Sequence, residues 1–401
     1  MNSLENLRTW IEIDAHAAKH NYDMFRKLIG TGSRGKKVQL WSVVKSNAYG
    51  HGLFVFSKLM DECGVDGFCV DSIVEGVALR HAGIKKPILV LGSTLASRYV
   101  EASRENIIVT VSNREAFAAI AREKNPPQFH IKIDSGMHRQ GFYVEEIPKI
   151  LALLKSRSVL RPALKGIYTH FASAKDINYP GYTDDQLKKY EKAVALFEKA
   201  GFKNMTKHAA ATGGTLINKK YHFDAVRIGI GLYGLWPSKE LEVQLSEKII
   251  LKPVLSWRTR ISEVKKLQKG DYVGYDLTER VPRATTMAVL PIGYWHGFPR
   301  ALSSLGEVLV RGERARVLGR VSMDITTIAL PDGGAKTKKS SIKPGDIATL
   351  IGKAGRSTGR SGSVRGDSDE IFAWEPSQKA GTTHYEFLTR LNPLMERVII
   401  R

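Results

Sequence analysis

The sequence predicts an α/β protein in which a (β/α)8 barrel of the TIM type is followed by a mainly-β domain. Between residues 8 and 244, short apolar runs alternate with helical patterns in about eight repeats, each close to the roughly 30 residues of a βαβ unit. Strands that alternate with helices indicate a parallel sheet, and eight repeats favour a closed barrel over an open sheet. From residue 245 to 401, strand-like runs follow one another with few helical stretches between them, which indicates the second domain.

Each barrel repeat begins with an apolar run and continues into a helical pattern. In chain order the apolar runs are WIEID, VQLWSVV, GFCV, PILVLG, NIIVTV, FHIKID, LKGIYTHFA and KHAAA, with DAVRIGIG closing the series. Asp14 is placed to cap the helix that follows WIEID. The strands of the second domain are expected in KIILKPVLSWRTRISEVKKL, ATTMAVLPIGY, GEVLVRG, RARVLGRVSMDITTIAL and DIATLIG, and residues 1–7 are expected to join them. Two segments rich in glycine, serine and basic residues, 332–346 and 353–370, are expected to be exposed loops.

Composition excludes several classes of protein. Hydrophobic residues make up 43 % of the chain, and no run approaches the ~20 apolar residues of a membrane span. Cys63 and Cys69 are too few for a disulfide framework, and the opening segment lacks a basic region followed by an apolar one. These observations predict a cytoplasmic protein with reduced thiols and no membrane partner. The net charge of +21 is spread along the chain without a zinc-finger or RRM-type motif, so we expect neither a nucleic-acid partner nor a bound metal.

The residues that could carry chemistry lie just beyond the expected barrel strands, where the active sites of such barrels lie. In VVKSNAYGHG, Lys45 follows two β-branched residues and precedes a turn, so its amine emerges at the end of a strand. The other strand-end candidates are Arg139, His170, His208, Thr212 and Arg227. Taken singly, each is explained as well by a surface base or a core histidine. Together they form a cationic pocket suited to a ligand with phosphate and carboxylate groups.

Two glycine-rich turns extend this interpretation. RIGIG and ATGG can offer backbone N–H groups to a phosphate because glycine permits close approach, although a tight turn alone would also explain them. A lysine amine in a cationic site is a nucleophile that forms Schiff bases with carbonyl groups. Pyridoxal phosphate combines such a carbonyl with a phosphate and with a ring nitrogen that needs a protein partner. It is therefore the cofactor that the pattern favours.

VVKSNAYGHG resembles the cofactor-lysine motif of the alanine racemase family, and the resemblance covers nearly the whole chain. The other matching motifs, in the family's order, are IEIDAHAAKHNY, IDSGMHRQGF, GIYTHFASA, RIGIGLYG, GYDLT, PIGYWHGFPR, GRVSMDITTI and GTTHYEFL. Several motifs in one order are far more specific than any one of them. The resemblance implies a barrel followed by a β domain. It also implies a homodimeric, pyridoxal-phosphate-dependent isomerase that interconverts L-alanine and D-alanine and so supplies D-alanine for peptidoglycan.

The resemblance further implies a role for each matching residue. Lys45 would hold the cofactor as an aldimine and act as one catalytic base, and Tyr275, lent by the partner subunit, would be the second. The cofactor would be bound by Lys45, Tyr49, His170, Thr212, Arg227, Gly229, Ile230 and Tyr385, with Arg227 facing the pyridine nitrogen and His170 supporting it. The substrate would be bound by Arg139, Met323 and Asp324. Lys132 would be the lysine that is carbamylated in many members and that orients Arg139, although an ordinary strand lysine explains it equally well.

Departures from the family pattern leave substrate choice open. Thr212 stands where the family usually has serine and keeps the hydroxyl, whereas Trp295 and His296 replace a small residue and an aspartate. One alternative is therefore a racemase for serine, lysine or a broad set of amino acids on the same fold. A decarboxylase is less favoured, because it would be expected to carry glutamate where Arg227 stands. An alternative of another class is a non-catalytic cofactor-binding protein, but such barrel-only proteins lack the β domain and its tyrosine.

Overall fold

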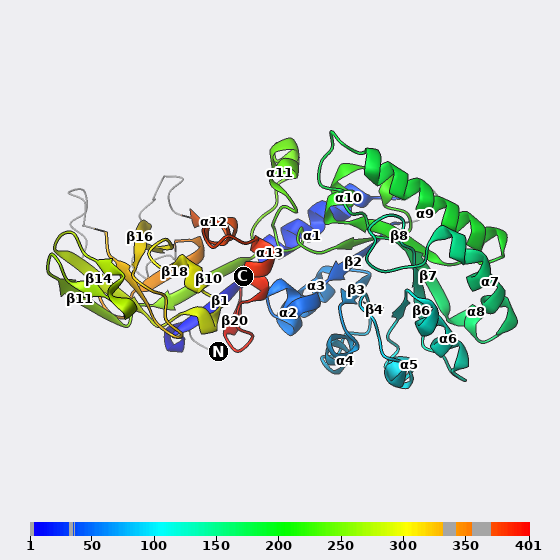
Figure 1. Ribbon diagram of the computed structural model, residues 1–401, viewed down its shortest axis with the longest axis horizontal. Coiled ribbons are helices and arrows are strands. Elements are labelled where there is room, and N and C mark those ends of the chain that lie inside the picture. The colour runs from blue at the N-terminus through cyan, green and yellow to red at the C-terminus, as the bar shows by residue number, and fades with distance from the viewer. Residues whose placement is uncertain (1–3, 32–34, 36, 332–341, 355–369) are drawn as a thin grey trace. The chain divides into compact units, whose positions relative to one another are not determined.

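The computed structural model describes residues 4–31, 35, 37–331, 342–354 and 370–401, and the chain divides into two compact units (Figure 1). The barrel unit comprises His16–Ala48 and Leu53–Pro253. The β unit comprises Met1–Ala15, Tyr49–Gly52 and Val254–Arg401. Most of the two basic segments expected to be loops, 332–346 and 353–370, lies outside the described residues. In the part of the chain that is described, no helix is long and apolar enough to cross a membrane.

The barrel unit is built on one parallel sheet, which has eight strands in the described part of the chain. Its strands are β2 (Gln39–Val43), β3 (Gly67–Val70), β4 (Ile88–Val90), β5 (Val109–Val111), β6 (Phe129–Lys132), β7 (Leu164–Tyr168), β8 (Thr206–Ala211) and β9 (Ala225–Ile228). The hydrogen-bonded order runs β4-β3-β2-β9-β8-β7-β6-β5. A parallel bridge between Leu89 and Ile108 joins β4 to β5 and closes the ring. The predicted α/β class, a barrel followed by a mainly-β unit, is confirmed.

The barrel strands are short and buried along their length, because their inner side chains fill the barrel and their outer side chains meet helices. Every residue of β3, β4, β5, β6 and β9 is buried, as expected for parallel strands covered on both faces. The helices of this unit are α1 (Ala15–Ile29), α3 (Leu53–Cys63), α4 (Ile73–His81), α5 (Tyr99–Arg104), α6 (Arg114–Arg122), α7 (Ile147–Ser156), α8 (Leu160–Ala163), α9 (Gly181–Lys199), α10 (Thr212–Ile217) and α11 (Lys239–Leu245). Figure 1 shows α4 to α9 around the outside of the strands.

The first apolar run of the chain lies in the other sheet. WIEID forms β1 (Thr9–Asp14), which pairs with β10 and β20 of the β unit, and Ala225–Ile228 supplies the eighth barrel strand instead. The expected barrel start at residue 8 therefore differs from the structure, in which this unit starts at His16. The reason is long-range pairing: Glu12 of β1 forms a largely buried ion pair with Arg258 of β10. An isolated strand pattern carries no information about such a partner.

The β unit is organised around one long mixed sheet. Its strands are β1, β10 (Leu255–Arg260), β11 (Glu263–Leu267), β14 (Thr285–Leu290), β15 (Glu307–Val310), β16 (Glu313–Leu318), β17 (Thr326–Ala329), β18 (Ile347–Lys353), β19 (Glu370–Ile371) and β20 (Glu396–Ile400). The order is β11-β14-β17-β16-β15-β18-β10-β1-β20, and β19 pairs with β18. A separate ribbon pairs β12 (Tyr272–Val273) with β13 (Glu279–Arg280). The helices α12 (Trp374–Lys379) and α13 (His384–Thr389) precede β20 in the chain.

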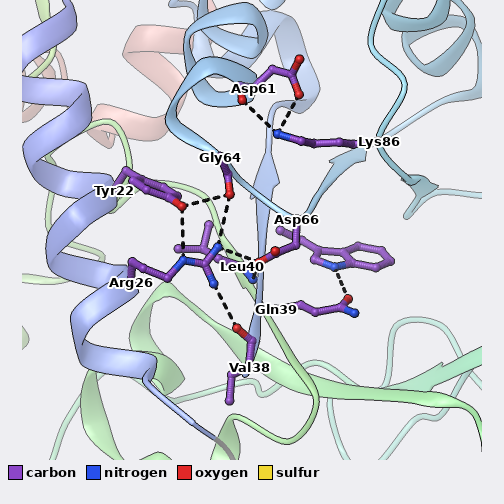
Figure 2. A network of polar contacts seen from close by, with 10 residues as sticks. Tyr22, Arg26, Val38, Gln39, Leu40, Asp61, Gly64, Asp66 and Lys86 are labelled. Carbon is purple, nitrogen blue, oxygen red and sulfur yellow. Dashed lines mark hydrogen bonds and ion pairs between the residues drawn. The ribbon is translucent and has the colours of Figure 1, made fainter. Parts of the chain in front are cut away.

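A polar network fastens helix α1 to the start of β2 and β3 (Figure 2). Arg26 on α1 forms an ion pair of 2.6 Å with Asp66, and its guanidinium donates to the carbonyl of Val38. Asp66 also accepts the backbone N–H of Leu40, at 2.8 Å. Tyr22, one turn before Arg26, donates its hydroxyl to the carbonyl of Gly64. One arginine thus connects the helix with two neighbouring strands.

Substituting Arg26→Met should lower the free energy of unfolding by about 2–3 kcal/mol, because several hydrogen bonds to a charged group are lost and Asp66 is left half-buried without its cation. Lys19→Met is a matched control, since Lys19 and Asp23 form an exposed ion pair on the same helix and such pairs contribute little. Urea unfolding followed by circular dichroism measures both. Equal midpoints for the two variants would contradict a stabilising role for the network.

Candidate active site

Lys45 lies at the carboxyl end of β2, as the sequence predicts, and begins the short turn α2 (Lys45–Tyr49). Ser46, Asn47, Ala48 and Tyr49 all have left-handed backbones, with φ of 56°, 55°, 51° and 52°. Each such residue costs roughly 1–2 kcal/mol, so the surroundings must impose the conformation. The left-handed residues begin directly after Lys45. The side chain of Lys45 therefore does not continue the alternation between the two faces of the strand.

Two side chains of the barrel unit hold this turn. Glu75 accepts the backbone N–H of Ser46 at 2.6 Å and that of Asp71 at 2.8 Å. The same carboxylate belongs to the capping box of α4. Asp71 in turn lies 3.6 Å from the Lys45 amine. Glu75 therefore connects the turn after β2 with the loop after β3, and Asp71 supplies a carboxylate beside the candidate nucleophile.

Cationic side chains converge on the same end of the barrel. Lys132 ends β6 and is buried, and burial together with Arg139, Arg227 and Lys45 lowers its pKa to about 8. Its Nζ donates to Oε1 of Gln140 at 3.1 Å. Three of the predicted site residues, Arg139, Arg227 and Lys45, thus help to lower the pKa of a fourth, Lys132. The arrangement attracts anions, because the positive charges outnumber the nearby carboxylates.

The loop that carries Arg139 is shaped by a single carboxylate. Asp134 accepts the backbone N–H groups of Gly136, His138 and Arg139 at 3.0, 3.0 and 3.1 Å. His138 has a left-handed backbone, with φ of 53°. The motif IDSGMHRQG therefore forms a tight loop around its own aspartate, and this loop brings Arg139 to the end of the barrel.

Arg227 on β9 is buried and donates to acceptors on β8 and on the segment that follows β7. Its Nη2 donates to the carbonyls of Thr169 and Ala209 at 2.8 and 2.9 Å, and to Nδ1 of His170 at 3.4 Å. Its Nη1 donates to Nδ1 of His208. The contact between His170 and Arg227 agrees with the supporting role that the resemblance implies. His208, a strand-end candidate, proves to be a second acceptor for the same guanidinium.

These contacts determine the state of the histidines. A guanidinium can only donate, so Nδ1 of His208 must be an acceptor, and its Nε2–H then donates to Nδ1 of His130 at 2.9 Å. Burial, followed by the charge of Arg227, lowers the pKa of His130 to about 3 and that of His208 well below its usual range. The same causes lower the pKa of His170 to about 3. All three imidazoles are therefore neutral acceptors or relays, and Arg227 keeps its charge.

The ring of Tyr168 lies against two of the cations, Arg227 and Lys132. The Arg227 guanidinium and the Lys132 amine lie 5.1 and 5.6 Å from the centre of its ring, and the ring stacks on His208 with centroids 4.8 Å apart. Its hydroxyl bonds Oγ1 of Thr110 at 2.9 Å, and burial raises its pKa to about 12. A neutral aromatic ring stabilises buried cations without cancelling their charge.

The neutral histidines predict acid sensitivity. Because the folded pKa of His130 and His170 is near 3 and the unfolded value is near 6.5, the unfolded chain binds more protons between these limits. Stability should therefore be present above pH 6.5 and be lost on acidification, by about 2 kcal/mol for each histidine from pH 7 to pH 5. Urea midpoints measured across this range test the slope. His130→Gln should reduce it, whereas His81→Gln, on the surface, should leave it unchanged; equal slopes would refute this origin.

The predicted phosphate site is a cradle of glycine backbone. The N–H groups of Gly229 and Gly231 both donate to Oγ1 of Thr212 at 3.3 Å. A Cβ on Gly231 would lie 2.4 Å from the ring of Phe25, so no larger residue fits there. Ile230, between the glycines, is buried. Backbone amides that converge beside a hydroxyl are groups of the kind that bind anions. With Lys45 and Arg227 in the same unit, the donor set fits pyridoxal phosphate.

Tyr49 and Tyr385 lie together in the β unit. Their ring centroids are 6.1 Å apart, and Tyr385 stacks on His384 at the start of α13. Burial raises the pKa of Tyr385 above its usual range, so its hydroxyl stays a donor. The structure thus brings together two tyrosines that are 336 positions apart (385 − 49).

Tyr275, Met323 and Asp324 form a second group in the β unit. Tyr275 is 68 % exposed and Met323 55 % exposed, and the loops that carry them are joined by an ion pair of 2.6 Å between Asp276 and Arg320. Asp324 lies 3.9 Å from Nδ1 of the buried His296. Exposed side chains on a fixed loop framework are available to another molecule.

Several residues around the site were not found from the sequence, namely Asp71, Glu75, His130, Asp134, Gln140 and Tyr168. The signal for one of them, His130, was the period of two in a strand, because His130 and the predicted Lys132 share one face of β6. A residue that lies two positions before the end of a strand points into the barrel, below the site. For Asp71 and Glu75 only the tertiary contacts reveal the role. Within the described residues, no group of three or more histidine, cysteine, aspartate or glutamate side chains could hold a metal ion.

The fold and the candidate site define a class of protein: a (β/α)8 barrel with a lysine, arginines and a glycine-rich turn at the strand ends, followed by a mainly-β unit in which Tyr275 and Met323 are exposed. Family models of the alanine racemase N-terminal domain and C-terminal domain match residues 13–237 and 254–399. The chain therefore belongs to the alanine racemase family.

Individual members of the family match along their whole length. The chain is 33 % identical to the alanine racemase of Leptospira interrogans, over 98 % of this chain and 96 % of the relative. It is 34 % identical to that of Halothermothrix orenii, over 99 % and 98 %. The crystal structure of alanine racemase from Bacillus anthracis with bound L-Ala-P has a TM-score of 0.85 and 32 % identity, covering 98 % of this chain and 95 % of that chain.

Proposed function

We propose that this protein is an alanine racemase, an isomerase that interconverts L-alanine and D-alanine with pyridoxal phosphate. The observation that supports this proposal most directly is the geometry of the barrel end. There Lys45 follows β2, and the amine of Lys132 and the guanidinium of Arg227 lie 5.6 and 5.1 Å from the centre of one ring, that of Tyr168. Family models cover both units of the chain.

The residues that would hold the cofactor follow from the contacts. Lys45 would bind its aldehyde, Thr212 with the Gly229–Ile230 turn its phosphate, and Arg227 its ring nitrogen. Tyr49 and Tyr385 would donate to the phosphate from the β unit. When bound, the cofactor supplies a conjugated acceptor that makes the α-proton of the amino acid removable. Since the guanidinium of Arg227 cannot accept a proton, it would leave the ring nitrogen of the bound cofactor unprotonated and so would restrict side reactions such as transamination.

Racemisation requires two groups that exchange protons with the same carbon, one on each face. We assign these roles to the amine of Lys45 and the hydroxyl of Tyr275. We assign no proton transfer to His130, His170 and His208, which are neutral. Their role would be to orient Arg227, directly through His170 and His208. Burial of Arg227 among neutral acceptors keeps its position constant through the reaction.

The substrate carboxylate would be bound by Arg139 and by the backbone N–H of Met323, with Asp324 beside it. Lys132 would be carbamylated, since burial and neighbouring cations lower its pKa to about 8 and so leave part of its amine neutral and reactive near neutral pH. The carbamate would place a negative charge next to Arg139. Mass spectrometry of the intact protein in bicarbonate, with Lys132→Arg as the control, tests this modification.

We further propose a homodimer with shared sites. The β unit carries an exposed apolar patch formed by Tyr275, Leu277, Tyr294, Trp295, Met323 and Ile325, each at least 45 % exposed. Large exposed aromatic and apolar side chains mark surfaces that bind another molecule. The backbone N–H of Trp295 donates to the carbonyl of Met323 at 3.0 Å, so two loops of this patch are one structure. A second copy of the chain would bring Tyr275 to its substrate.

The test is to incubate the purified protein and pyridoxal phosphate with each L-amino acid in turn and to measure the D-enantiomer by chiral chromatography. We expect alanine to be racemised fastest, and the role in the cell to be the supply of D-alanine for peptidoglycan in the cytoplasm. Faster turnover of serine or lysine would favour the alternative racemases. Cofactor binding without any racemisation would favour a non-catalytic binding protein.

A further inference from the structure

Arg397 on β20 donates hydrogen bonds only to backbone carbonyls among the described residues. Its Nη1 donates to the carbonyls of Asn392 and Met395 at 2.7 and 2.6 Å, and its Nη2 to that of Leu391 at 3.4 Å. Nε and Nη2 both donate to the carbonyl of Gly50, at 3.3 and 3.0 Å. A guanidinium presents several donors in a fixed planar fork, so one side chain can hold several segments at once.

The segments that Arg397 joins are the two that carry the tyrosine pair. Gly50 follows Tyr49 directly, whereas Leu391 and Asn392 follow helix α13, which carries Tyr385. All of these residues belong to the β unit. The ring centroids of Tyr49 and Tyr385 lie 6.1 Å apart, and the two segments that carry these tyrosines are the ones that Arg397 joins.

The backbone of the 49–52 segment is fitted to this arrangement. Gly50 has φ of +84°, and a Cβ there would lie 1.9 Å from the carbonyl oxygen of Leu388 in α13. Gly52 has φ of +99°, and a Cβ there would lie 3.2 Å from Cγ of Arg397. A side chain at position 50 would collide with α13, and both positions have a backbone conformation that favours glycine, so the segment is built for close packing here.

We infer that Arg397 is a positioning residue for the cofactor's phosphate: it holds the 49–52 segment against α13 and so sets the ring of Tyr49 beside that of Tyr385. The inference rests on the proposed function, because the two tyrosines are taken as phosphate donors. Arg397 itself touches neither cofactor nor substrate. Its loss should weaken cofactor binding while the chemistry of the bound cofactor is retained.

The experiment compares Arg397→Met with Arg260→Met. Arg260 on β10 is a matched control, because it also donates to three carbonyls of the β unit, those of Leu4, Leu7 and Gly345. Titration of cofactor-free protein with pyridoxal phosphate should show about ten- to hundredfold weaker binding for Arg397→Met, as expected when a hydrogen bond to a charged group is lost. Its kcat at saturating cofactor should stay within about twofold of the unsubstituted protein. Arg260→Met should bind the cofactor normally, even if its thermal midpoint falls as far.

A double-substitution cycle with Tyr49→Phe tests whether Arg397 acts through Tyr49. If it does, Arg397→Met should weaken cofactor binding much less in the Tyr49→Phe background than in the unsubstituted one. Equal fold-changes in both backgrounds, unchanged affinity in Arg397→Met, or an equal loss in Arg260→Met would overturn the inference. Should Arg397→Met not fold, Arg397→Lys keeps the charge without the planar fork, and normal cofactor affinity in that variant would overturn the inference equally.

Amide hydrogen exchange on the cofactor-free protein separates this inference from the proposed function. Residues 49–52 should exchange faster in Arg397→Met than in the unsubstituted protein and in Arg260→Met. If the unsubstituted protein binds no pyridoxal phosphate, the proposed function fails, while the exchange result still decides whether Arg397 holds the segment. Unchanged exchange at residues 49–52 would overturn the inference even if cofactor binding is normal.

Discussion

Substituting Lys45→Ala should abolish racemisation, lowering kcat by at least about a thousandfold, because the chain would lose both the covalent attachment point and one of its two proton-transferring groups. The purified protein should be yellow and should lose this absorbance in the variant. After borohydride reduction of the unsubstituted protein, peptide mapping should find the cofactor on Lys45. The position of Lys45 at the end of β2, on a turn held in a left-handed conformation, is the structural reason for this expectation.

Lys45→Arg separates the amine's chemistry from its charge. Arginine would keep a cation beside Asp71, which lies 3.6 Å from the lysine amine, but it is always protonated and cannot act as a nucleophile. It should therefore be as inactive as Lys45→Ala while retaining the fold. Lys165→Ala, an exposed lysine on β7, should remain fully active. Recovery of the reduced adduct on any other lysine would refute the assignment.

Mixing two inactive variants, Lys45→Ala and Tyr275→Phe, should restore about a quarter of the unsubstituted activity. After random exchange about half of the dimers are mixed, and each mixed dimer has one intact site of two if the sites are shared. The structural reason is the exposure of Tyr275, at 68 %, on a loop that its neighbours hold in place. The side chain of Tyr275 is therefore accessible to another molecule, as a shared site requires.

The control for this recovery is a mixture of Lys45→Ala with a chain that carries both substitutions. No dimer in that mixture has an intact site, so it should stay inactive. Subunit exchange is confirmed independently with two affinity tags. If exchange is complete and the first mixture is no more active than the second, each subunit uses its own Tyr275 and the shared arrangement is wrong.

Strand composition and motif order were enough to predict the class of fold and the barrel end on which the site lies. VQLWSVV, FHIKID and DAVRIGIG are apolar runs with a basic residue near their carboxyl ends: Lys45 after the first, Arg139 in the loop after the second and Arg227 within the third. In a parallel barrel the carboxyl ends of the strands lie at one end. The prediction of Lys45, Arg139 and Arg227 as neighbours depended on that rule alone. In the structure, the Lys132 amine and the Arg227 guanidinium lie 5.6 and 5.1 Å from the centre of the same ring, that of Tyr168.

The sequence by itself thus determined the local structure and the residue types of the site, because strand period, turn residues and motif order are properties of short segments. Only the tertiary structure decided that WIEID pairs with strands of the β unit and that His170 and His208 accept hydrogen bonds from Arg227. It also decided that Arg397 binds the carbonyl of Gly50, directly after Tyr49. These outcomes depend on pairings between segments that lie far apart in the chain, such as Glu12 with Arg258 and Gly50 with Arg397. A buried donor takes whichever carbonyl the folded chain brings to it, and no local pattern specifies that partner.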